Sequence, residues 1–222
     1  MVDAPATRPR DSRDSGETSL RILDAARRRL LADGYAGLST RKVAEQAQVP
    51  LSQLHYHFGS KGGLILALFA GENQRRLDRQ RAMYAEDLPL WQRYERACDF
   101  LEDDLESGYV RVLQEMIAAG WSNPEIGDAV RELLAGWYTL LVDVARETER
   151  RYGPLGPFTA EEIATLIGNA FIGSESLLLL GVDRNIQPVR SALRRIGVVI
   201  RQFEEGSARP GGPDDARVRT DQ

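Results

Sequence analysis

The chain has 222 residues, of which 42% are hydrophobic and 28% are charged, and its formal net charge is −4. These values predict one large or two compact globular domains. No run approaches the roughly 18 consecutive apolar residues of a membrane-spanning helix, and the first residues lack the apolar core of a secretory signal. We therefore expect a cytoplasmic protein with no membrane partner.

Cysteine and histidine are scarce in this chain. The single cysteine, Cys98, excludes an internal disulfide. With only His55 and His57 beside it, there are too few ligands for a His/Cys zinc site. Residue counts leave a metal site made of carboxylates alone open, but we predict no metal and no cofactor.

Positive charge is concentrated near the N-terminus. Residues 18–61 hold seven Lys or Arg side chains and three acidic ones, a net charge of +4, whereas the rest of the chain is acidic. Such a basic segment is typical of a protein that binds nucleic acid through one part of its surface.

The first elements are short helices. Residues 1–17 have almost no large apolar side chains and predict a disordered arm. Apolar residues then recur at helical spacing, which predicts helices over 18–33 (capped by Thr18), 40–47 (capped by Ser39), 50–57 and 61–85 (capped by Ser60). Gly34 stands where a left-handed residue commonly ends a helix.

Longer helices follow, and no segment alternates in the manner of a strand. The expected ranges are 88–106, 109–120, 124–151, 160–180 and 188–204, with a capping box at Thr159 and Glu162. The composition of residues 206–222 predicts a disordered tail. The fold class is therefore all-α.

The segment Leu38–Leu66 carries the functional signal. Two short helices flank a break at Gln48-Val49-Pro50, small Ala44 and Ala47 lie where the helices would cross, and the second helix has a polar outer face. This arrangement is typical of a helix-turn-helix, whose second helix enters the major groove of DNA.

The same residues resemble the DNA-binding domain of the TetR family of transcriptional regulators. The resemblance covers about residues 18–66 and rests on a set of motif residues: Ile22-Leu23-Asp24-Ala25-Ala26, Gly34-Tyr35, Ser39-Thr40, Val43-Ala44, Ala47, Val49, Leu54, Tyr56, His57-Phe58 and Ser60-Lys61. It implies a helix-turn-helix domain over 18–65 and a helical ligand-binding and dimerisation domain over 66–205.

The resemblance also implies the DNA contacts. Arg41 would reach a base edge or a phosphate, Ser52 and Gln53 would read bases, and Leu51 would touch a thymine methyl. Thr40 and Lys61 would hold phosphates. His55 stands where the family usually has tyrosine, so the division of contacts among His55, Tyr56 and His57 stays open.

Two residues of the turn depart from the family pattern. Gln48 replaces the usual glycine, and we expect it to adopt a left-handed conformation at a modest energetic cost. Pro50 replaces the usual Ser or Thr cap, so we expect the helix start to depend on the fixed φ of proline.

The last two helices carry apolar stripes that fit either an internal core or a subunit interface. The resemblance favours a homodimer interface made by Leu166, Ala170, Leu177, Val189, Leu193, Ile196 and Ile200. A reader of this size also needs two recognition helices about one DNA turn apart.

The remaining helices are rich in aromatic residues, which fill a core or surround a ligand. The family binds small-molecule effectors, so we expect an unidentified effector near Met116, Trp121, Trp137, Tyr138 and Phe171, oriented by Glu115 or Asn169.

The predicted function is a TetR-like, ligand-responsive regulator that binds a pseudo-palindromic, double-stranded DNA operator as a dimer, as a repressor. One alternative is a sequence-tolerant architectural DNA-binding protein. A helical enzyme is a weaker alternative, because Cys98 has no histidine near it in the sequence and we identify no catalytic residue.

Overall fold

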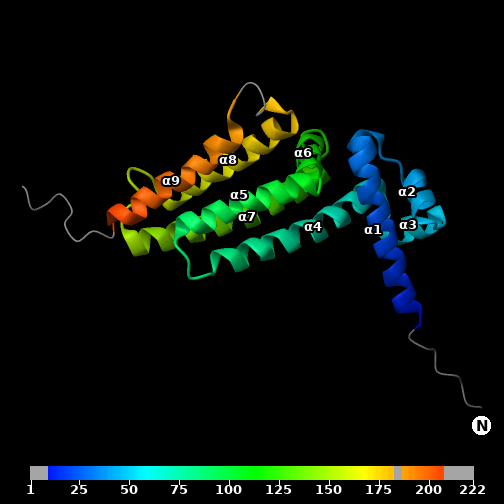
Figure 1. Cartoon of the computed structure of the whole chain (residues 1–222). Helices are drawn as coiled ribbons and strands as arrows, with labels where there is room; N and C mark the ends of the chain where they lie inside the picture. The colour runs from blue at the N-terminus through cyan, green and yellow to red at the C-terminus, as the bar shows by residue number, and fades with distance from the viewer. Residues whose placement is uncertain (1–9, 183–186, 208–222) are drawn as a thin grey trace, which may run out of the picture. The chain divides into compact units, whose positions relative to one another are not determined.

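The chain is described by a computed structural model that places residues 10–182 and 187–207, and all regular structure within these ranges is helical (Figure 1). The helices are α1 (Arg10–Gly37), α2 (Thr40–Ala47), α3 (Leu51–Phe58), α4 (Lys61–Tyr84), α5 (Leu90–Glu106), α6 (Tyr109–Gly120), α7 (Pro124–Tyr152), α8 (Ala160–Leu179) and α9 (Val189–Ser207). The all-α fold class is confirmed.

The largest difference from the expected helices is at the N-terminus. Helix α1 begins at Arg10, so Thr18 lies inside a helix and is not its cap, and residues 10–17 of the predicted arm are helical. Residues 1–9 of that arm and 208–222 of the predicted tail lie outside the described residues. Gly34 has φ 70° and breaks the helical path, as the sequence predicts.

The described residues divide into two compact units. The N-terminal unit comprises residues up to Gln74 together with Arg111–Val130, and the C-terminal unit comprises Arg75–Val110 and residues from Arg131 onward. The predicted boundary at 65/66 differs from this division, because α4 continues unbroken through it and most of α6 packs in the N-terminal unit.

Helices α1, α2 and α3 form the core of the N-terminal unit. Their inward residues are fully or nearly fully buried: Ile22, Ala25, Ala26, Leu30, Val43, Ala44, Ala47 and Leu54. The small alanines of α2 let it lie close to α1 and α3. Leu64 and Ile65 from the start of α4 are also completely buried.

Helix α6 supports the end of α1 within the same unit. The Glu115 carboxylate accepts a hydrogen bond from the Tyr35 backbone N–H, and Arg111 Nη1 donates to the Leu31 carbonyl at 2.8 Å. These bonds satisfy backbone groups that the break at Gly34 leaves without helical partners.

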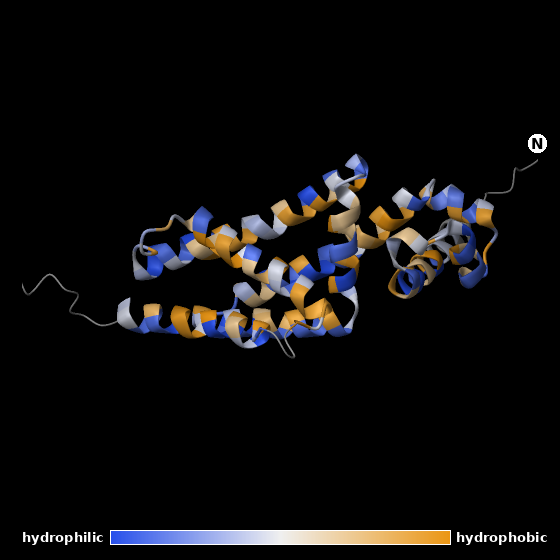
Figure 2. Ribbon diagram, turned by 90° about the horizontal axis from the view of Figure 1, so that it is seen from above, coloured by the Kyte–Doolittle hydropathy of each residue, from blue (hydrophilic) through white to orange (hydrophobic). Residues whose placement is uncertain are grey.

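The C-terminal unit is a bundle whose main core joins α5, α8 and α9. Tyr94, Cys98 and Leu101 of α5 lie in one buried cluster with Phe171 of α8 and Leu193 of α9. The Tyr94 hydroxyl donates to the Leu193 carbonyl at 2.9 Å. Hydrophobic and hydrophilic residues are interspersed along the long helices (Figure 2).

A buried carboxylate ties the second half of α4 to α5. Asp104 accepts hydrogen bonds from Arg76 Nε at 2.9 Å and Arg79 Nη2 at 2.8 Å. Burial raises the pKa of Asp104, and the two guanidinium groups act in the opposite direction. The capping box of α8 is present as predicted, since Thr159 and Glu162 each accept the other's backbone N–H.

Two features are absent from the described ranges. No helix there is both long and apolar enough to cross a membrane. No three His, Cys, Asp or Glu side chains there are grouped in a way that would hold a metal ion.

Candidate functional site

The turn between α2 and α3 has the predicted left-handed residue. Gln48 has φ 55° and ψ 46° and ends α2, and the Val49 N–H donates to the Ala44 carbonyl at 3.0 Å. Glycine is the usual residue in this conformation because its lack of Cβ avoids a clash with the carbonyl.

Arg21 of α1 stabilises the same turn, and the sequence analysis did not identify it. Its Nη2 donates to the carbonyls of Ala47, at 2.7 Å, and Gln48, at 3.0 Å. These are C-terminal carbonyls of α2, which lack helical N–H partners and carry the negative end of the helix dipole. A basic residue near a helix end is a known signal, but Arg21 is 26 residues from Ala47 in sequence.

Helix α3 presents its polar residues outward. Pro50 is the residue before α3 rather than its first residue, with φ −57° and ψ 142°, and it makes no side-chain cap bond. Leu54 is completely buried and fixes the inner face, whereas Ser52, Gln53 and His55 are exposed and Leu51 is half-buried. No contact with the described residues therefore covers the outer face of α3.

The three aromatic side chains at the end of α3 differ in their surroundings. Tyr56 is 79% exposed. His55 Nδ1 lies 2.8 Å from the Gly59 carbonyl and must carry the proton to donate to it, which leaves Nε2 free to accept. His57 is half-buried beside Tyr56, with ring centroids 5.2 Å apart, and its Nε2 is buried without a partner. Tyr56 and His55 are thus the more accessible pair.

The other expected DNA contacts, Arg41 to a base edge or a phosphate and Thr40 and Lys61 to phosphates, lie on α2 and α4 of the same unit. Arg41 is exposed and forms no ion pair with the described residues, and Thr40 beside it is half-buried. Lys61 begins α4 with its ammonium 4.5 Å from the centre of the Tyr35 ring, and partial burial lowers its pKa. All nine residues predicted to contact DNA therefore belong to one unit.

Sequence comparison identifies this unit. A profile of the family described as "Bacterial regulatory proteins, tetR family" matches residues 22–68. The chain carries a TetR-family helix-turn-helix domain. A curated relative, the HTH-type transcriptional regulator YvkB of Bacillus subtilis, is 37% identical over 59 residues, which are 27% of this chain and 31% of that protein. The chain is thus similar to less than a third of that relative's length.

Structural comparison extends the likeness beyond the TetR-family domain to most of the chain. A regulator from Saccharomonospora viridis, in complex with choline, has a TM-score of 0.68 at 23% identity and covers 86% of this chain and 96% of its own. The regulator FadR of Bacillus subtilis, in complex with stearoyl-CoA, has a TM-score of 0.67 at 17% identity and covers 84% and 98%. At these identities the comparison establishes the shared fold.

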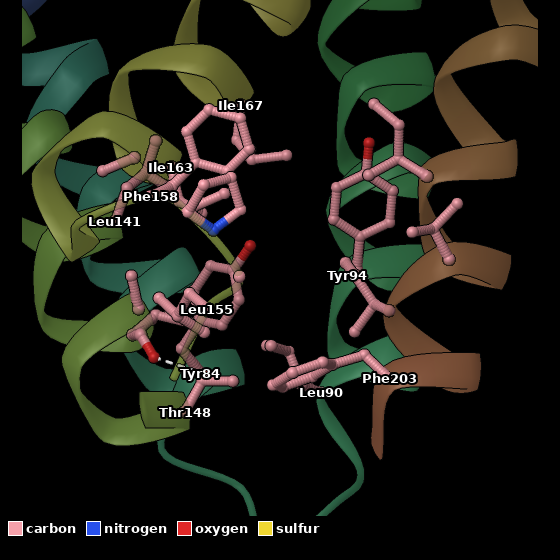
Figure 3. Close-up of a pocket in the computed structure, with 18 residues that line it drawn as sticks. Tyr84, Leu90, Tyr94, Leu141, Thr148, Leu155, Phe158, Ile163, Ile167 and Phe203 are labelled. Carbon is pink, nitrogen blue, oxygen red and sulfur yellow. Dashed lines mark hydrogen bonds between the residues drawn. The ribbon is translucent and has the colours of Figure 1, made fainter. Parts of the chain in front are cut away.

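An apolar cavity of about 420 Å³ lies within the C-terminal unit. Side chains of α4, α7, α8 and the 153–159 loop line one side, with Leu155 and Phe158 among them, and side chains of α5 and α9, with Tyr94 and Phe203, line the other (Figure 3). We call this space the apolar cavity. Its size is within the range of small-molecule sites, roughly 300–1,000 Å³.

None of the seven residues predicted to surround an effector lines the apolar cavity. Glu115, Met116 and Trp121 belong to the N-terminal unit, where Glu115 holds α1, Met116 is completely buried and Trp121 is 83% exposed. The number of aromatic residues suggested that they line a cavity, but these three residues lie elsewhere, in the N-terminal unit.

The other four predicted effector residues lie in the C-terminal unit. Trp137 and Phe171 pack against each other in the core, with ring centroids 6.2 Å apart, while Tyr138 and Asn169 are exposed. The cavity is lined mainly by Leu, Ile and Val side chains instead. In a sequence, such residues cannot be distinguished from those of an ordinary core.

The seven predicted dimer residues fall into two groups. On α9, Val189 and Leu193 are buried in the chain's own core, and Ile196 and Ile200 pack against it. Val189 and Leu193 are therefore internal, whereas Ile196 and Ile200 are half-buried at the edge of that core. On α8, Leu166 is 51% exposed, while Ala170 and Leu177 are partly buried against the core.

Cys98 has no features of a catalytic nucleophile in this structure. The residue is 2% exposed, and burial raises the pKa of its thiol to about 11. A thiol with that pKa is almost entirely protonated at neutral pH and reacts slowly.

Proposed function

We propose that the protein is a dimeric, ligand-responsive transcriptional regulator that represses by occupying a pseudo-palindromic DNA operator. The observation that carries this proposal is α3, a short helix with a buried inner residue and a free polar face in a TetR-family domain. Bacterial DNA is in the cytoplasm, where we expect the protein to act.

In this proposal α3 enters the major groove and Gln53, Ser52 and Leu51 face the bases. Arg41, Thr40 and Lys61 contact phosphates on either side. His55, Tyr56 and His57 complete the contact surface, and the accessible Tyr56 and His55 are the ones we assign to DNA.

Ligand response is supported by the apolar cavity and by two structural neighbours that were solved with small molecules, choline in one and stearoyl-CoA in the other. An effector would act by binding more tightly to a conformation whose recognition helices no longer fit the operator. Helix α4 has residues in both units and would connect effector binding to DNA binding.

The dimer is proposed to form through the exposed part of the last two helices rather than through the buried stripe of α9. Leu166 of α8 and Val198 of α9 are among the exposed apolar side chains there. Isologous pairing of such a surface gives the two-fold symmetry that a palindromic operator needs.

The direct test is selection of bound fragments from genomic DNA with the purified protein, followed by affinity measurements on the selected site and on random DNA. We expect the selected site to be bound more tightly by a factor on the order of a thousand or more. A ratio near one would instead indicate an architectural DNA-binding protein and would reject the proposal.

Two substitutions separate base reading from phosphate binding. We expect Gln53→Ala to change sequence preference, because it removes a side chain that faces the bases. We expect Lys61→Ala to weaken binding to all sequences similarly and to reduce the salt slope by about one. Fluorescence anisotropy on selected and random DNA over a range of salt measures both effects. Equal behaviour of the two variants would contradict the assignment of base reading to Gln53.

A further inference from the structure

We propose that the apolar cavity binds an uncharged, mainly hydrocarbon molecule that carries a single hydrogen-bonding group, and that this group bonds to the Tyr84 hydroxyl. That this molecule is the effector of a regulator rests on the proposed function. The cavity itself and its chemistry are properties of the C-terminal unit.

The lining disfavours a ligand whose charged group would be buried inside the cavity. The cavity is lined by 18 residues, and none of them is charged. Leucine, isoleucine, valine and alanine side chains make up most of the surface, with aromatic rings from Tyr84, Tyr94, Phe158 and Phe203. Moving an ion from water into such surroundings without an opposite charge costs several kcal/mol. A neutral hydrocarbon gains free energy there by leaving water.

Three side-chain hydroxyls reach the lining, and two of them are already used. The Tyr94 hydroxyl donates to the Leu193 carbonyl at 2.9 Å, and the Thr148 hydroxyl donates to the Val144 carbonyl at 2.8 Å. Each of these donors is occupied within the protein and contributes mainly its carbon atoms to the cavity surface.

The third hydroxyl, that of Tyr84, is free. Tyr84 is only 7% exposed, its hydroxyl forms no hydrogen bond with the described residues, and the ring extends into the space between the two sides of the cavity (Figure 3). Burial raises the pKa of Tyr84, so its hydroxyl stays protonated and able to donate. A ligand oxygen in the cavity would accept a hydrogen bond from this unused donor.

The experiment compares three molecules with the same ten-carbon chain: 1-decanol, decanoate and decyltrimethylammonium. Each is titrated below its micelle concentration into the full-length protein by calorimetry. We expect 1-decanol to bind at least about tenfold more tightly than either ion, because only the alcohol is neutral. Equal or tighter binding of decanoate or of the ammonium compound would overturn the inference, and so would the absence of binding by all three.

Tyr84→Phe tests the assigned hydroxyl, since it removes one oxygen and preserves the ring. We expect it to weaken 1-decanol binding about three- to tenfold and to leave unchanged the binding of N-phenyl-1-naphthylamine, a neutral fluorescent probe. Tyr138→Phe is the matched control, because Tyr138 is exposed and lies outside the cavity lining. Unchanged decanol affinity in Tyr84→Phe, or an equal loss for both probes, would overturn the role of Tyr84.

Failure of this inference is separable from failure of the proposed function. Binding of the three molecules is measured without DNA, and operator selection is performed without ligand. A protein that selects an operator but binds none of the molecules contradicts only the inference drawn here.

Discussion

Gln48 determines how the two short helices of the N-terminal unit are joined. Its left-handed backbone costs a residue with a Cβ about 1–2 kcal/mol relative to a right-handed one, and its side chain is exposed. Two hydrogen bonds from Arg21 to the adjacent carbonyls favour this turn despite that cost.

We therefore expect Gln48→Gly to stabilise the protein by about 1 kcal/mol, because glycine adopts positive φ without a clash. The measurement is the midpoint of urea unfolding followed by circular dichroism. Gln46→Gly is the matched control, since Gln46 is exposed and lies inside α2. There glycine should destabilise by roughly 0.5–1 kcal/mol. If Gln48→Gly lowered the free energy of unfolding, as Gln46→Gly should, the turn would not be strained.

At the residue scale, sequence reasoning succeeds where the cause is local. Positive φ at Gln48 follows from its place between two helices, and the capping box follows from Thr159 and Glu162 three residues apart. The hydrogen bond from Arg21 to the Ala47 carbonyl joins residues 26 positions apart, and the bond between Tyr35 and Glu115 joins residues 80 positions apart. No local pattern encodes such contacts.

At the scale of elements, the junction between α3 and α4 depends on close backbone packing. A Cβ added to Gly63 would lie 2.3 Å from the Phe58 carbonyl oxygen, whereas one added to Gly62 would lie 3.5 Å from its nearest neighbour, the Ser60 Oγ. The Phe58 carbonyl also accepts a hydrogen bond from Ser60 N–H at 2.7 Å, so it cannot move without losing that bond.

We expect Gly63→Ala to destabilise the protein by roughly 1–3 kcal/mol, the usual cost of overpacking, and to weaken DNA binding by displacing α3 from α4. Gly62→Ala should be neutral or slightly stabilising, because alanine favours helix and the site has room. Thermal unfolding and DNA titration of the two variants check this. Equal effects of the two alanines would contradict the close packing at Gly63.

Apart from α1, which begins at Arg10 rather than near Thr18, the helix boundaries follow the prediction closely, because apolar periodicity, proline and glycine mark them. What a helix packs against was predicted less well. The stripe of Val189, Leu193, Ile196 and Ile200 was assigned to a partner subunit, but it packs on the chain's own α5 and α8. The same spacing serves a core and an interface equally, so only the fold separates them.

At the scale of the whole molecule, the charge distribution favours oriented approach to DNA. Residues 18–61 carry a net charge of +4, whereas the whole chain carries −4. The acidic side chains outside this segment repel phosphate, whereas the basic ones attract it. The electrostatic field therefore favours an approach in which α2 and α3 meet the duplex. This effect weakens as salt rises, because the Debye length shortens to about 8 Å at physiological ionic strength.

A dimer with two recognition helices requires a fixed spacing between operator half-sites. We expect insertion of roughly 5 bp, half a helical turn, between the half-sites to reduce affinity to that of a single half-site. The second helix would then face the opposite side of the duplex. Gel-shift titration of original and lengthened sites measures the loss, and sedimentation of the free protein checks the dimer. Undiminished binding to the lengthened site would rule out a rigid dimer.

The unbroken course of α4 has a mechanical consequence. Its 24 residues, from Lys61 to Tyr84, span about 36 Å at 1.5 Å per residue. Lys61 is our assigned phosphate contact, and Tyr84 carries the free hydroxyl of the apolar cavity. Within this helix each backbone N–H bonds to the carbonyl four residues earlier, so Lys61 and Tyr84 belong to one cooperative hydrogen-bonded element. A molecule bound at Tyr84 would thus act on the same cooperative helix whose first residue is Lys61.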